Sequence, residues 1–221
     1  MKRNWLRHLL PSTYRLVVIC VLIGVFGAGA ALAFDLLVEV SQRYLLEGVA
    51  GYAPPRAGVL EPTASLPDPG LLWWIPVVTG LGGLLGGCLV YFLAPEAEGH
   101  GTDAAVAAYH HRGGAVRVRV PPVKAVASAL TIGSGGVAGR EGPTAQIAVG
   151  LGAMAANWFR LRGQERRIVL LASMAGGLAA VFRAPLGMAI FAVEILYSGM
   201  FFESEALIYT CLLYTSPSPR D

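Results

Sequence analysis

The sequence predicts an all-α membrane protein that crosses the bilayer several times. Of its 221 residues, 55% are hydrophobic and 14% are charged, whereas about 25% of the residues of a soluble domain are charged. This composition argues against a soluble enzyme. Two charge-free runs, 16–34 and 71–94, are long enough for helices that cross a hydrocarbon core of about 30 Å. Beyond residue 95, shorter apolar runs alternate with Gly-rich or Gly-Pro breaks.

The first apolar run follows a basic segment, residues 1–15, which we expect to be a cytoplasmic N-terminus. A signal peptide would have only roughly 7–15 apolar residues, so we expect 16–34 to be a retained helix. We expect this helix to continue past Asp35 and Glu39. The prolines of residues 51–70 then predict an exposed loop.

The second apolar run contains two overlapping Gly-x-x-x-Gly spacings, at glycines 82, 83, 86 and 87. Such spacings let helices approach closely, so we expect a neighbouring helix on this face. Trp73 and Trp74 at the start of the run suit a membrane interface.

The later apolar runs are shorter: 125–138, 142–159, 168–182 and 184–193. Interrupted helices of this kind occur in transporters, where they place helix ends at membrane depth. The basic segments 112–124 and 160–167 match the basic N-terminus. By the positive-inside rule, we expect all three on the cytoplasmic side and the Pro-rich loop outside.

Residues 133–146 combine glycines, an Arg-Glu pair and a proline. Pro143 suits the first turn of a helix, and a helix that starts near Gly142 would present free N–H groups and the positive end of its dipole to an anion. The carboxylate of Glu141 would compete for the same donors, so its protonation or displacement would open the site. The glycines do not indicate a dinucleotide site, because no acidic residue follows about 20 residues later.

The segment Gly139-Arg-Glu-Gly-Pro-Thr-Ala-Gln146 resembles the G-R-E-G-P motif of the CLC family of chloride channels and proton-coupled chloride antiporters. Three further segments resemble family motifs in the same order: 94–101, 121–124 and 177–186 with 191–194. The resemblance extends over residues 14–210. It implies a CLC-type fold of tilted and broken helices, in which residues 16–210 form the first of two inverted repeats.

The resemblance also implies a transport protein and not an enzyme, with no catalytic residue, cofactor or metal. Glu141 would be the gating glutamate. The implied partners are chloride or a similar small anion, the lipid bilayer and, in the full-length protein, a second copy in a homodimer; basic clusters that would indicate nucleic acid are missing. The implied location is the plasma membrane, or the bacterial inner membrane. The anion-binding residues would be Gly99, His100, Gly101, Thr102, Gly139, Arg140, Gly142 and Pro143.

The sequence departs from the family pattern at His100, where the family commonly has a serine between two glycines. A histidine donates hydrogen bonds and can also gain a charge in the physiological pH range. The alternative is that His100 turns away and leaves backbone N–H groups and Thr102 to bind the ion. Fluoride and nitrate are therefore alternatives to chloride as the anion that the site binds. We expect Asp103 to cap the short helix that follows.

A second departure concerns protons. Family antiporters commonly have two successive glutamates where this sequence has Glu194 and Ile195. Isoleucine cannot carry a proton, so we expect channel-like conduction. The alternatives are chloride/proton antiport, with Glu194 in the proton pathway, and a non-transporting membrane fragment that only binds a partner.

The last residues, 211–221, are abruptly polar and resemble a translated sequencing adapter. We therefore expect the natural sequence to end here at residue 210 and the protein to continue in a second half.

Overall fold

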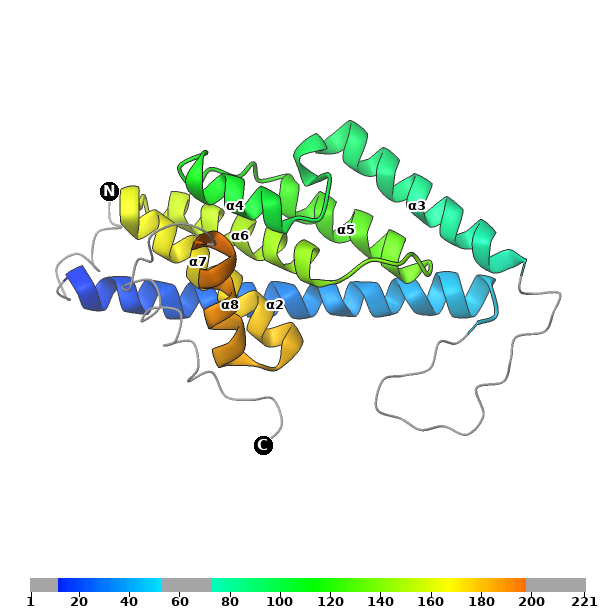
Figure 1. Cartoon of the computed structure of the whole chain (residues 1–221), viewed down its shortest axis with the longest axis horizontal. Coiled ribbons are helices and arrows are strands. Elements are labelled where there is room, and N and C mark those ends of the chain that lie inside the picture. Colours follow the sequence, from blue (N-terminus) through cyan, green and yellow to red (C-terminus); the bar gives the residue numbers. More distant parts are fainter. Residues whose placement is uncertain (1–11, 53–72, 198–221) are drawn as a thin grey trace.

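The computed structural model describes residues 12–52 and 73–197, and within them all regular structure is helical (Figure 1). This confirms the all-α prediction. Most of the Pro-rich loop and the polar segment 211–221 lie outside the described residues. The helices, in chain order, are α2 (Ser12–Gln42), the π-helical turn η1 (Arg43–Val49), α3 (Trp74–Leu93), the 3-10 turn η2 (Pro95–Ala97), α4 (Thr102–His110), α5 (Val120–Gly133), α6 (Glu141–Trp158), α7 (Gly163–Phe182) and α8 (Pro185–Tyr197).

The helix α2 runs along most of the length of the molecule (Figure 1). Its 31 residues correspond to about 46 Å at a rise of about 1.5 Å per residue. The prediction that it continues past Asp35 and Glu39 is confirmed. In the described part of the chain, α2 with η1 and α3 are long and apolar enough to cross a membrane. Both expose large apolar side chains, such as Phe26 on α2 and Leu84 on α3, as a lipid-facing helix does.

The core lies where α7 packs on both α2 and α6. Small residues bring these helices together, because a Cβ added at Gly176 would lie 2.6 Å from the carbonyl oxygen of Gly24 on α2. About one turn before Gly176, the hydroxyl of Ser173 donates to the carbonyl of Ala148 on α6 (2.7 Å). The middle of α7 is therefore buried without a break from Ile168 to Leu178.

The glycines of α3 act as expected on only one side. Gly82 and Gly86 pack on α5, and a Cβ on Gly86 would lie 2.9 Å from the carbonyl oxygen of Ala127. Gly83 and Gly87 have nothing within 4 Å of an added Cβ, and they line a cavity instead. One of the two Gly-x-x-x-Gly spacings thus supports helix packing, and the other leaves open space on the side of α3 that faces the cavity.

The boundaries of the short helices differ from the apolar runs. α5 begins at Val120, inside the basic segment 112–124, because Pro121 occupies its first turn, where a missing N–H costs nothing. α7 likewise begins at Gly163, inside the basic segment 160–167. An apolar run marks the residues that avoid water, and charged residues at a helix start do not interrupt the helix.

Candidate functional site

The starts of α4 and α6 touch each other through two glycines. The segment before α4 crosses the first turn of α6 so closely that a Cβ on Gly142 would overlap the carbonyl oxygen of His100, and one on Gly101 would overlap the carbonyl of Gly142. Gly101 also has a φ of +104°, in the left-handed region that glycine adopts without strain. Only glycine at both positions therefore allows the two helix starts to meet.

Free donors gather at this contact. The first N–H groups of a helix have no partner within the helix, so α6 offers those of Glu141 and Gly142, and α4 offers those of Thr102 and Asp103. Pro143, in the first turn of α6, contributes no N–H. Two positive helix ends side by side favour an anion between them.

The expectation that Asp103 caps α4 is wrong. Gly101 occupies the N-cap position, no side chain caps the helix, and Asp103 lies in the first turn. The positive φ at the cap and the close approach of Gly142 demand glycine there, and this tertiary contact is not visible in the local sequence.

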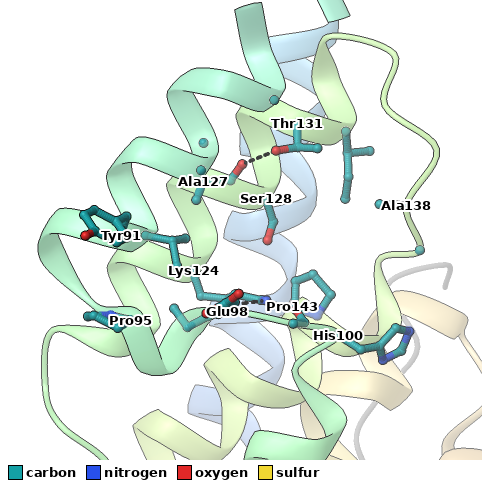
Figure 2. Close-up of a pocket in the computed structure, with 18 of the residues that line it drawn as sticks. Tyr91, Pro95, Glu98, His100, Lys124, Ala127, Ser128, Thr131, Ala138 and Pro143 are labelled. Carbon is teal, nitrogen blue, oxygen red and sulfur yellow. Dashed lines mark hydrogen bonds between the residues drawn. The ribbon is translucent and has the colours of Figure 1, made fainter. Parts of the chain in front are cut away.

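A cavity of about 660 Å³ lies next to the two helix starts (Figure 2). Its walls come from α3, η2 and the segment after it, α5, and the connection between α5 and α6. Tyr91 and Pro95 lie on one side and His100 and Ala138 on the other (Figure 2). Of the residues predicted to bind the anion, the cavity is lined by Gly99, His100, Gly139 and Pro143.

Lys124 is a site residue that the sequence reasoning did not single out. It lines the cavity, its side chain is buried, and its ammonium donates to the carbonyl oxygens of Ala97 (2.9 Å) and Gly99 (2.7 Å). The ammonium therefore brings a positive charge to the cavity wall and holds the segment that leads to His100. Its place five positions after Arg119, in the helix that begins at Val120, was the available signal.

His100 and Thr102 contact each other. The ring Nδ1 of His100 lies 3.0 Å from the hydroxyl oxygen of Thr102, and the tautomer decides which group donates. His100 is exposed at the edge of the cavity, whereas Thr102 is buried at the first position of α4. The hydroxyl of Thr102 therefore has the ring of His100 as a hydrogen-bond partner.

Glu141 and Arg140 point to different neighbours. Glu141 is the first residue of α6 and is exposed, and its carboxylate turns back over Gly139, 3.0 Å from where a Cβ of that glycine would lie. The guanidinium of Arg140 forms an ion pair with Asp35 of α2. The side chain of Arg140 is therefore directed to α2.

Two other acidic groups lie away from this centre. Glu194 is exposed on α8 and is not among the residues that line the cavity, and Ile195 beside it is half-buried. Glu96, in η2, forms an ion pair with Arg117, and the hydrogen bond from this guanidinium lowers the pKa of the Glu96 carboxyl.

Comparison with known proteins identifies one family and two similar solved structures. The family described as "Voltage gated chloride channel" matches residues 82–215, a match that includes the first residues of the segment 211–221. A slow cyanobacterial Cl⁻/H⁺ antiporter is 27% identical, with a TM-score of 0.61 over 90% of this chain and 43% of the antiporter. A eukaryotic CLC transporter is 26% identical, with a TM-score of 0.70 over 91% of this chain and 36% of the transporter. The chain thus spans less than half the length of either solved structure.

Proposed function

Because the chain belongs to the voltage-gated chloride channel (CLC) family, whose match covers more than half of it, we propose that the full-length protein carries chloride or a similar small anion across a membrane. The observation that carries this proposal is the contact between Gly101 and Gly142. It brings the positive ends of α4 and α6 together beside a cavity whose wall holds the ammonium of Lys124. No cofactor takes part, since backbone N–H groups are the anion ligands.

Glu141 gates the anion in this proposal. Its carboxylate lies at the N-terminal end of α6, beside Gly139 at the cavity. An ionised carboxylate and a dissolved anion compete for the same helix end, because both are stabilised by its dipole and its free N–H groups. Protonation of Glu141 removes its charge and vacates the site.

Conduction without protons is the mode that we propose first, because Ile195 offers no second proton acceptor next to Glu194. The second candidate is chloride/proton exchange. It is favoured by the similarity to the cyanobacterial protein described as a Cl⁻/H⁺ antiporter, and it would use Glu194 in the proton pathway.

The family indicates a membrane location, and the positions of the basic segments indicate the orientation. Members of this family are integral membrane proteins, and we propose the plasma membrane, or the bacterial inner membrane, with the N-terminus in the cytoplasm. The basic segments around residues 112–119 and 160–167 support this orientation. A homodimer with one pore in each subunit completes the proposal.

The test is flux through liposomes that contain the full-length gene product. Chloride efflux above that of empty liposomes supports the transport function, and equal efflux contradicts it in favour of a protein that only binds a partner. Conduction predicts that a chloride gradient moves no protons uphill. Uphill proton movement that stops when Glu194 is replaced by glutamine would instead establish the exchange mechanism.

A further inference from the structure

An ion pair connects the middle of α2 with the residue directly before the gate. Asp35 of α2 and Arg140 are 105 positions apart in the sequence, and the carboxylate of one contacts the guanidinium of the other. Both side chains are half-buried, at 38% and 37% exposure. A pair of this kind has more effect on its neighbours than a fully exposed one, because solvent screens it less.

The pair anchors a connection that has little else to hold it. The connection between α5 and α6 is fixed at its start, where the hydroxyl of Thr79 donates to the carbonyl of Ser134 (2.7 Å) and the N–H of Gly136 donates to Thr131 (2.9 Å). Val137 is then fully exposed. After Gly136, the next hydrogen bond that ties this connection to another helix, within the described residues, is the one between Arg140 and Asp35.

Arg140 has one carboxylate as its partner in space and another as its neighbour in the sequence. One is Asp35, its partner in the structure, and the other is Glu141, the next residue in the chain. A guanidinium beside a carboxylate favours the ionised form of that carboxylate. In the structure, the guanidinium has Asp35 and not Glu141 as its ion-pair partner.

The other charged groups on the helices around α6 have different surroundings. On α5, Lys124 is bound to carbonyl groups. At the start of α7, Glu165 pairs with Arg15 and Arg166 bonds Asn157 near the far end of α6. Other charged or titratable groups on or directly beside these helices include Tyr14, Cys20 and Glu39 on α2, His100, Asp103, Tyr109 and His110 before or on α4, Arg119 before α5, Arg162 and Arg167 at the start of α7, and Arg183 after its end.

We propose that Asp35 is a positioning residue for the gate: it binds the guanidinium of Arg140 and so keeps this charge from pairing with the carboxylate of Glu141. The proposal rests on the gating role of Glu141. In this proposal α2 also serves the gate, because Asp35 holds the guanidinium of Arg140 and leaves the carboxylate of Glu141 without this ion-pair partner.

The test is the pH dependence of chloride efflux from liposomes that contain the full-length protein. In Asp35→Asn, Arg140 is released and pairs with Glu141, so the midpoint of the pH profile should fall by about one unit. The conservative Asp35→Glu should keep the original midpoint. Glu39→Gln, one turn further along α2, is the matched control and should also leave it unchanged.

The double variant Asp35→Asn/Arg140→Gln separates this role from a structural one. With no free guanidinium, it should return the midpoint to that of the unmodified protein, and it avoids the unpaired charge that could prevent Asp35→Asn from folding. A midpoint that stays in place in Asp35→Asn, or that shifts equally in the double variant, overturns the proposal.

Infrared titration distinguishes failure of this proposal from failure of the transport function. The carboxyl band that is lost in Glu141→Gln reports protonation of Glu141 without any flux. Even if the protein passes no chloride, the midpoint of this band should fall in Asp35→Asn and return in the double variant. An unchanged band in Asp35→Asn would overturn the role of Asp35, whatever the flux.

Discussion

Single residues determine the chemistry of the site. The glycines at 101 and 142 admit the close contact of two helix starts, and larger side chains there would overlap backbone atoms. Lys124 adds a buried positive charge, and Glu141 adds the one negative charge at the start of α6. Local chemistry predicted Glu141 and the helix start near Gly142, and the family resemblance added Gly101. The contact of Lys124 with Gly99 depends on how α5 packs.

The histidine at position 100 should affect which anion is preferred. Its ring forms a hydrogen bond with the hydroxyl of Thr102. The substitution His100→Ser removes the ring, so this hydroxyl should become available to the anion. One neutral hydrogen bond is worth about 1 kcal/mol, so the ratio of chloride to nitrate permeability should change about fivefold. Flux assays with each anion measure the ratio. Thr102→Val, which removes the hydroxyl, is the matched control, and an equal ratio in His100→Ser and the unmodified protein would show that His100 takes no part.

At the scale of helices, the sequence predicted which helices form better than it predicted where they begin and end. The long apolar runs became α2 and α3 because length and the absence of charge define such helices. α5 and α7 each begin five residues before the corresponding apolar run, because charged residues at a helix start do not interrupt the helix. The contact between α4 and α6 was not predictable in the same way, since it joins glycines 41 positions apart and depends on tertiary packing.

The contact between α4 and α6 should be sensitive to one methyl group. Gly101→Ala places a Cβ against the carbonyl of Gly142 and also strains the backbone at a positive φ. We expect a loss of roughly 2–4 kcal/mol in the free energy of unfolding, measured by denaturation in detergent. Gly99→Ala is the matched control, because its φ is also positive but nothing lies within 4 Å of the added Cβ. Equal losses in the two variants would contradict the proposed contact.

The ion pair between Glu96 and Arg117 should make the stability of this region depend on pH. Because the guanidinium lowers the pKa of the Glu96 carboxyl, the pair stabilises the folded protein above the ordinary carboxyl range and is lost as the pH falls through the lowered pKa. Between about pH 7 and about pH 3.5, the melting temperature of Arg117→Gln should therefore fall by less than that of the unmodified protein. The same loss in both proteins would show that the pair contributes nothing.

At the scale of the molecule, α2, α6 and α7 form a packed centre, and α5 and α3 lie beside it (Figure 1). Residues of α3 and α5 form part of the wall of the cavity. The packed centre fixes the position of the start of α6, and Gly139 and Pro143 at this start line the cavity. The apolar outer faces of α2 and α3 suit a lipid environment. This arrangement fits a protein whose ion site consists of helix ends held at depth.

The most direct measurement of the central claim compares chloride efflux of the full-length protein and of Glu141→Gln across a range of pH in liposomes. The glutamine cannot ionise and so imitates the protonated gate. We expect the unmodified protein to pass chloride faster as the pH falls, and Glu141→Gln to pass chloride at a fast rate that does not change with pH. A response to pH in Glu141→Gln equal to that of the unmodified protein would contradict the account.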